Sequence, residues 1–130
     1  MSHPYSYRYH PPIPTLEIAL SAPEGDIAIG PLLAIVDTGA DASIIPEEYL
    51  TRIGAIIVDE ASLRSHWGES RRVHLYQVDL RVDGQPLPDV EAIGDEQDHE
   101  ILLGRDVLNR FRVLLGGPAE IVKVLDGQTE

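Results

Sequence analysis

The sequence contains no cysteine, one methionine, one tryptophan and one phenylalanine among its 130 residues. Without cysteine the chain can form no disulfide bond, no thiolate metal site and no cysteine nucleophile. Basic side chains are also scarce, because 10 lysines and arginines stand against 22 aspartates and glutamates, a formal net charge of −12. A surface of this sign repels nucleic acid and anionic membranes. The composition therefore predicts a protein that binds neither of them.

Long apolar runs are missing as well. The longest, Leu32–Val36, is far too short to span a bilayer, and the N-terminal segment lacks the apolar stretch of a secretory signal. We therefore expect a cytoplasmic protein. Hydrophobic residues make up 43% of the chain and charged residues 25%, as in folded globular domains, and the length suits a single domain.

The chain divides into three predicted segments. Residues 1–14 contain four prolines and three alternating tyrosines, which favour an extended N-terminal arm. Such an arm is either a mobile terminus or a segment that docks on a partner. Residues 15–126 carry the patterns of a folded domain, and residues 127–130 form a short C-terminal tail.

Most of the domain is predicted to be strand. Apolar residues alternate with other residues over 15–20 and most clearly over 76–82, and Leu32–Val36 is apolar on both faces, as in a strand buried on both sides. The dipeptide Asp83-Gly84 predicts the tight turn of a hairpin. Two short helices are expected, at Glu47–Arg52 and Arg105–Phe111. This content indicates an all-β barrel or sandwich with one or two short helices.

The apolar strand at Leu32–Val36 ends at Asp37–Gly39, an Asp-Thr-Gly tripeptide. A carboxylate at the end of a rigid strand can be held in a desolvated cleft, and glycine lets the backbone approach closely. Later in the chain Ile101–Asp106 reads as apolar residues followed by glycine, arginine and aspartate at the start of a predicted helix. Together, in this order, the two segments resemble the single-lobed, retropepsin-like (retroviral-type) aspartic proteases, and the resemblance extends over residues 15–125.

The resemblance implies an all-β, retropepsin-like acid protease barrel with aspartic endopeptidase activity. Peptide hydrolysis in this class uses a water molecule and two aspartates that share a proton, with no cofactor and no metal. The chain contains one Asp-Thr-Gly and no Asp-Ser-Gly. We therefore expect a homodimer in which each copy contributes Asp37, acting on a peptide or protein substrate.

The resemblance also implies roles for single residues. Asp37, Thr38 and Gly39 would be the catalytic residues: Thr38 would hydrogen-bond across the dimer axis and Gly39 would contact the substrate backbone. Ala40 would line the site. Asp41 would form a structural ion pair with Arg105 and could also bind the substrate main chain. The alternative for these last two residues is a pair of unrelated surface charges.

A β-hairpin flap is expected between Ala61 and Val78, with its tip at residues 66–70. There Trp67 and Gly68 are candidate substrate contacts. Trp67 would be either an apolar lid that excludes water from the site or ordinary core. In viral relatives the terminal strands of the two subunits interleave, so Ile121–Leu125 and the N-terminal arm are candidate dimer contacts here.

Two other hypotheses remain open from the sequence. One is a proteolytically silent dimerisation or binding module with the same fold, and the other is an unrelated β-domain with a chance Asp-Thr-Gly. His99 lies among acidic residues, but adjacent acids without ligand spacing are usually a solvated loop, so we predict no metal site.

Overall fold

The structure is a computed structural model, and it describes residues 2–64 and 68–125. The described residues form ten strands, two α-helices and one 3₁₀ helix. In chain order these are β1 (Ser2–Pro4), β2 (Thr15–Ser21), β3 (Ala28–Val36), β4 (Ile44–Pro46), α1 (Glu47–Arg52), β5 (Ile56–Arg64), β6 (Ser70–Val82), β7 (Gln85–Asp95), β8 (Ile101–Leu103), α2 (Arg105–Leu108), β9 (Val113–Gly116), η1 (Gly117–Ala119) and β10 (Ile121–Val124).

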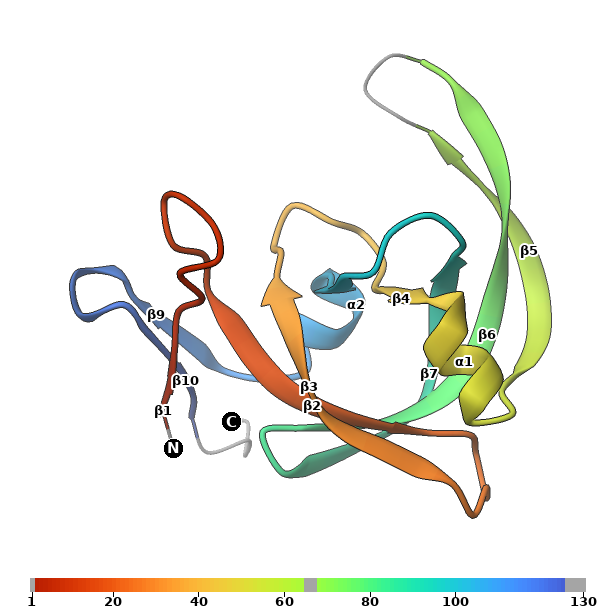
Figure 1. The fold of residues 1–130 in the computed structure, drawn as a ribbon, viewed down its shortest axis with the longest axis horizontal. Coiled ribbons are helices and arrows are strands. Elements are labelled where there is room, and N and C mark those ends of the chain that lie inside the picture. The colour runs from red at the N-terminus through yellow and green to blue at the C-terminus, as the bar shows by residue number, and fades with distance from the viewer. Residues whose placement is uncertain (1, 65–67, 126–130) are drawn as a thin grey trace.

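Seven strands form one sheet in the order β2-β3-β8-β4-β7-β6-β5, and an additional pairing of β2 with β6 closes six of them into a barrel (Figure 1). The closure depends on the length of β6, which has 13 residues. Its second half pairs with β2, while its first half pairs with β5 outside the barrel. The all-β barrel with two short helices that the sequence predicted is therefore confirmed.

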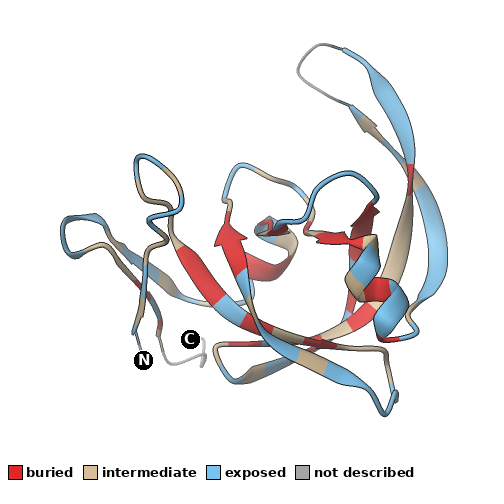
Figure 2. Ribbon diagram, viewed as in Figure 1, coloured by how far each residue is buried: buried red, intermediate tan, exposed pale blue. Residues whose placement is uncertain are grey.

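The core lies inside this barrel. Leu16, Ile18 and Leu20 on β2 are all buried, as the alternating pattern requires, and β3 ends in three consecutive buried residues, 34–36 (Figure 2). Complete burial of one such aliphatic side chain is worth about 1.5–3 kcal/mol. The end of β3 is thus a rigid support for the loop that follows it.

Local signals in the sequence agree with most of these elements. The turn residues Asp83 and Gly84 both have positive φ, 49° and 80°, the conformation of a type I′ hairpin turn. Helix α1 has the predicted bounds. Helix α2 is shorter than predicted and ends at Leu108 instead of Phe111, because the N–H groups of Arg110 and Phe111 bond to carbonyls three residues back and tighten the last turn.

A second, three-stranded sheet contains both ends of the described chain, in the order β1-β10-β9. Ser2 pairs with Lys123 and Pro4 with Ile121. The Tyr7 hydroxyl donates a hydrogen bond to the Glu120 carboxylate, which raises the pKa of Tyr7. The start of the N-terminal arm therefore lies against the C-terminal strand of its own chain. Among the described residues, no helix is long and apolar enough to cross a membrane.

Candidate active site

Asp37 directly follows β3, where its backbone N–H donates to the Leu103 carbonyl of the parallel strand β8 at 3.0 Å. The chain then turns tightly, since the Ala40 N–H donates to the Asp37 carbonyl at 3.2 Å. The Gly39 N–H donates to Oδ1 of Asp37 at 3.0 Å. Asp37 is half-buried, while Thr38 and Gly39 are exposed. The carboxylate is thus held by a rigid strand and still faces solvent.

The second sequence motif packs directly behind this loop. The Arg105 N–H donates to the Ala40 carbonyl at 2.9 Å. A Cβ at Gly104 would lie 2.7 Å from both the carbonyl carbon and the oxygen of Ala42, closer than side chains ever approach backbone. Glycine at position 104 is therefore required for the two motifs to meet.

Arg105 binds the loop through its side chain as well. Nη1 donates to the Thr38 carbonyl at 2.9 Å, and Nη2 lies 2.6 Å from Oδ1 of Asp41. The structure thus brings Asp41 and Arg105 together, as the resemblance implied. The Asp41 side chain is 91% exposed, however, so solvent screens the ion pair and its contribution to stability is small.

A polar pair to which the sequence assigned no role, the buried Ser43 and the partly buried Asp106, fixes the other end of the loop. The fully buried Ser43 hydroxyl donates to Oδ1 of Asp106 at 2.7 Å and accepts a hydrogen bond from the Gly104 N–H at 2.9 Å. The Ser43 N–H donates to Oδ2 of Asp106 at 3.1 Å. The available signal was a serine four residues after the Asp-Thr-Gly and an aspartate at the end of the second motif. Charged hydrogen bonds of this kind are stronger than neutral ones, and here they join two segments far apart in sequence.

Strands β5 and β6 form the predicted hairpin, in which Arg64 pairs with Ser70. It rises from the barrel at the upper right of Figure 1, on the side where the loop after β3 also lies. Gly68 is exposed and has a φ of 85°. Trp67, the predicted lid or core residue, lies outside the described residues.

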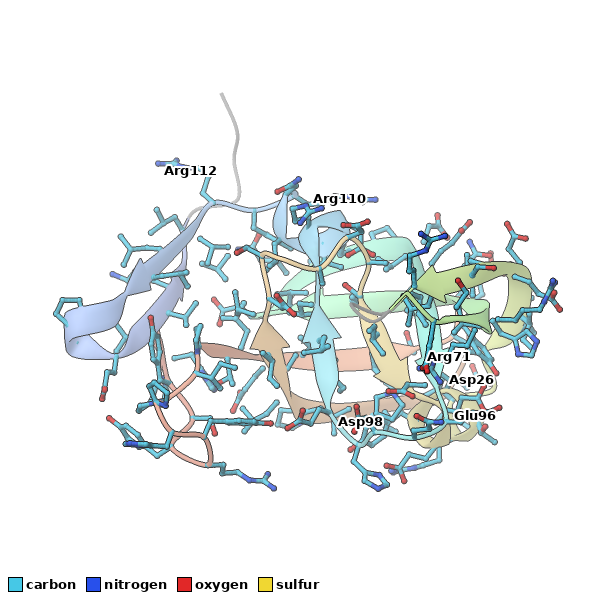
Figure 3. All side chains as sticks on the ribbon, turned by 90° about the horizontal axis from the view of Figure 1, so that it is seen from above. Asp26, Arg71, Glu96, Asp98, Arg110 and Arg112 are labelled. Carbon is cyan, nitrogen blue, oxygen red and sulfur yellow. The ribbon has the colours of Figure 1, made fainter. Side chains whose placement is uncertain are left out.

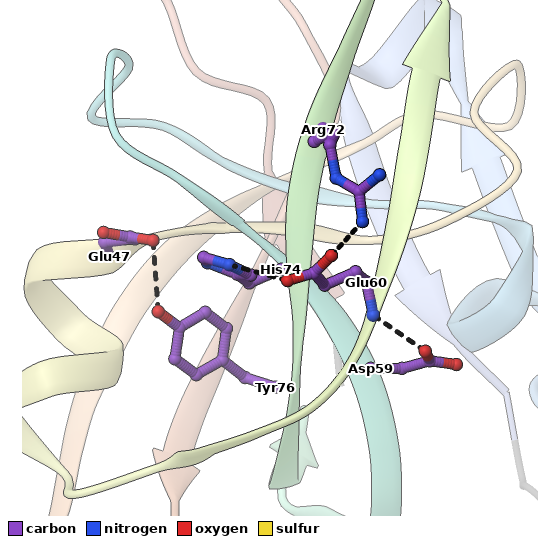
Figure 4. Close-up of polar contacts among 6 residues, drawn as sticks. All are labelled: Glu47, Asp59, Glu60, Arg72, His74 and Tyr76. Atoms are coloured by element: carbon purple, nitrogen blue, oxygen red, sulfur yellow. Dashed lines mark hydrogen bonds and ion pairs between the residues drawn. The ribbon is translucent and has the colours of Figure 1, made fainter.

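Polar contacts stiffen the lower part of this hairpin (Figure 4). Arg72 on β6 forms a hydrogen-bonded ion pair with Glu60 on β5, and His74 lies 3.6 Å from the same carboxylate. The hydrogen bond and charge of Arg72 hold the pKa of Glu60 below its ordinary value. The Tyr76 hydroxyl donates to Glu47 of α1 at 3.1 Å, and burial, together with this contact, raises the pKa of Tyr76.

The acidic segment 95–100 lies away from the Asp37 loop. Asp95 is buried, lies 3.5 Å from Arg71 and accepts a hydrogen bond from the Gln97 N–H. Figure 3 shows Glu96 and Asp98 on the side of the molecule opposite Arg110 and Arg112. Within residues 2–64 and 68–125 there is no group of three or more histidine, aspartate or glutamate side chains that could hold a metal ion.

The family model described as "gag-polyprotein putative aspartyl protease" matches residues 24–110, which include both motifs. The match covers more than half of the chain, and the chain belongs to this family. No curated protein sequence matches it.

Solved structures agree with this assignment. A retropepsin-like aspartic protease from Rickettsia conorii superimposes with a TM-score of 0.63 at 14% identity, over 95% of this chain and 88% of that one. The EIAV protease in complex with an inhibitor gives 0.56 at 19% identity, over 75% and 86%. The retroviral protease-like domain of Ddi1 from Leishmania major gives 0.53 at 17% identity, over 88% and 90%. At these identities the likeness shows that the fold is retropepsin-like.

Proposed function

We propose that the protein is an aspartic endopeptidase that works as a homodimer, with one Asp37 from each copy in the catalytic pair. The observation that supports this most directly is the placement of the Asp37 carboxylate. It stands at the end of a strand whose last three residues are buried, in a loop held by Leu103, Gly104 and Arg105, and Asp37 itself is only half-buried. Among the described residues its one hydrogen-bond donor is the Gly39 N–H of its own turn, and a carboxylate with so few structural contacts is suited to chemistry.

The chemistry requires a second carboxylate beside the first. One ionised aspartate accepts a proton from water as the water oxygen attacks the peptide carbonyl carbon, and the protonated aspartate donates to the carbonyl oxygen. The tetrahedral intermediate then breaks at the C–N bond, and a proton passes to the leaving amine. Among the described residues, only the Gly39 N–H hydrogen-bonds to the Asp37 carboxylate, and it uses Oδ1, so Oδ2 has no hydrogen bond within this part of the chain.

In this proposal the second carboxylate comes from another copy of the chain. The sequence has one Asp-Thr-Gly. Thr38 and Gly39, which flank the carboxylate, are exposed and available to a partner. In the dimer we assign Thr38 to a contact across the twofold axis, which would hold the two Asp37 carboxylates at a fixed separation.

The remaining site residues would contact the substrate. We assign Gly39 and Asp41 to the substrate backbone, because both are exposed beside Asp37. Ala40 would line the site. Trp67 and Gly68, which come shortly before β6 in the sequence, would close over the bound peptide and exclude water from the dyad.

The test is digestion of a peptide library from acidic to neutral pH, with and without pepstatin. Asp37→Asn should abolish cleavage, because it removes the group that exchanges protons with water and keeps the side-chain size. The matched control is Asp26→Asn, an exposed aspartate in the turn before β3, which should cleave like the wild type. Cleavage by Asp37→Asn at the wild-type rate would refute the assignment. A wild-type protein that dimerises and cleaves nothing would be a silent dimerisation module.

A further inference from the structure

The hairpin of β5 and β6 leaves the barrel at Leu75. Strand β6 pairs with β7 from Leu75 to Val82, whereas residues 70–74 pair with β5 and with no other strand among the described residues. We call residues 60–64 and 70–74 the outer hairpin. Because an isolated two-stranded hairpin has little stability of its own in water, the position of the outer hairpin depends on contacts that reach back to the barrel.

One such contact is the ion pair between Arg71 and Asp95. Nη2 of Arg71 lies 3.5 Å from Oδ1 of Asp95. Within residues 2–64 and 68–125, this is the one side-chain hydrogen bond or ion pair that joins the outer hairpin to the barrel, since the contacts of Arg72 and His74 go to Glu60 inside the hairpin. Figure 3 shows Arg71 on the same side of the molecule as the residue that follows Asp95.

Asp95 is firmly held in the barrel. It is the last residue of β7, where it pairs with Pro46 of β4, and its side chain is 8% exposed. Oδ1 also accepts a hydrogen bond from the Gln97 N–H at 3.0 Å. A buried carboxylate favours a cation beside it, because an unpaired buried charge is costly. Asp95 is therefore a fixed anchor for the side chain of Arg71.

The same anchor is connected to the loop that carries Asp37. Strand β4 begins directly after Ser43, where that loop ends, and pairs with the last three residues of β7. Ser43 itself is hydrogen-bonded to Asp106. The strand pairing thus fixes Asp95 relative to the loop, and the ion pair fixes the outer hairpin relative to Asp95.

We propose that Arg71 and Asp95 are positioning residues that hold the outer hairpin in place relative to the Asp37 loop before a peptide binds. The inference rests on the proposed function, in which this hairpin closes over the substrate. Without the ion pair the hairpin samples more positions, and a bound peptide must order it at a cost in conformational entropy. In the described part of the chain neither residue hydrogen-bonds to the Asp37 carboxylate, so the pair acts on substrate binding and not on proton transfer.

The chain contains its own matched control for this contact. Arg71 and Arg72 are neighbours on β6 with the same charge, but Arg72 binds Glu60 on β5, inside the hairpin (Figure 4). Arg71→Gln therefore removes a contact between hairpin and barrel, whereas Arg72→Gln removes a contact within the hairpin. Both variants change the net charge by the same amount.

Distances between spin labels test the position of the hairpin without a substrate. The chain has no cysteine, so labels can be attached to Ser62→Cys on β5 and Thr51→Cys on α1, both exposed positions. An excess of unlabelled protein restricts the measurement to label pairs within one chain. Arg71→Gln should widen the distribution of distances, and Arg72→Gln should leave it unchanged. An unchanged distribution in Arg71→Gln, or equal widening in both variants, would overturn the proposal.

Kinetics with a peptide chosen from the library digestion test the consequence for binding. Arg71→Gln should raise KM about fivefold at an unchanged kcat, the upper end of what a partly exposed ion pair contributes. Arg71→Lys keeps the charge and should raise KM less. Wild-type KM in Arg71→Gln, or a fall in kcat at unchanged KM, would overturn the proposal.

Asp95→Asn separates the two contacts of the carboxylate. The amide oxygen can still accept from the Gln97 N–H, while the charge that attracts Arg71 is lost. This variant should therefore match Arg71→Gln in KM, and the double variant should be no worse than either single one. Fully additive losses would show that the two residues act independently and would refute the pair.

The inference and the proposed function can fail separately. An active enzyme whose Arg71→Gln variant has the KM and the distance distribution of the wild type would refute the positioning pair and leave the function standing. A wild-type protein that cleaves no peptide, together with a wider distribution in Arg71→Gln alone, would refute the function and support the contact that holds the hairpin.

Discussion

The Ser43 hydroxyl offers the most direct test of how the loop that carries Asp37 is held. Ser43→Ala removes the donor to Asp106 and the acceptor for the Gly104 N–H, and it leaves the backbone bond from Ser43 to Asp106 in place. Ser43 is fully buried, so water cannot replace the lost hydroxyl without opening the structure. We therefore expect a large loss of stability for the removal of one atom.

The magnitude can be estimated from the two lost contacts. A hydrogen bond to a charged group contributes about 1.5–3 kcal/mol, and an unsatisfied buried N–H costs about 1–3 kcal/mol. Because the two contacts share one oxygen and are not additive, we expect the free energy of unfolding to fall by about 3 kcal/mol. For a domain of this size that corresponds to a decrease in Tm of roughly 10 °C.

Urea unfolding of the variants and the wild type at the same protein concentration measures this change with the contribution of dimerisation held equal. The matched control is Ser62→Ala, because Ser62 is exposed on β5, and it should change stability by less than about 0.5 kcal/mol. A double-mutant cycle with Asp106→Asn isolates the coupling between the two side chains. If Ser43→Ala and Ser62→Ala unfold at the same urea concentration, the buried pair does not hold the loop.

Three further outcomes are expected. Gly104→Ala should destabilise the fold by about 2 kcal/mol or more, because the added Cβ would lie 2.7 Å from the Ala42 backbone. The control Gly117→Ala should cost less than about 1 kcal/mol, because no atom lies within 4 Å of the added Cβ. Equal urea midpoints for the two variants would contradict this prediction. Arg105→Ala should lower the free energy of unfolding by at most about 1 kcal/mol, because the Asp41 side chain that it pairs with is 91% exposed. A decrease above about 3 kcal/mol in urea unfolding would show that the Asp41–Arg105 ion pair is stronger than its exposure allows. The contribution of the Glu60–Arg72 pair should be present above pH 4.5, the ordinary pKa of the Glu60 carboxyl, and should vanish as the pH falls through the lower pKa of the folded state. The stability difference between wild type and Glu60→Gln, measured against pH, should therefore shrink on acidification, and a constant difference would refute the assignment.

Some features of the fold could be predicted because they depend on neighbouring residues. The turn at Asp83-Gly84 requires two residues that tolerate positive φ, and both have it. Helix α1 was predicted with its observed bounds. Helix α2 was predicted three residues too long, because the apolar spacing does not show where the last turn tightens.

Other features required the folded chain. For the N-terminal arm the sequence left two alternatives, a mobile terminus and a segment that docks on a partner. Neither of them was pairing with the C-terminal strand of the same chain. Proline content indicates that a segment is extended, but it does not indicate which strand the segment pairs with. Arg105 was expected to matter through Asp41, but it also binds the Thr38 carbonyl, and a main-chain acceptor has no signature in the sequence.

By itself, the sequence determined the fold class, the two motifs and the presence of one Asp-Thr-Gly in the chain, because residue type, period and turn chemistry are properties of short segments. The tertiary structure alone decided that the buried Ser43 and the partly buried Asp106 form a hydrogen-bonded pair and that β9 is left as an edge strand among the described residues. The first depends on closure of the barrel and the second on the strand order of the three-stranded sheet. Which distant segments become neighbours depends on the pairing of many strands at once, and no local pattern encodes it.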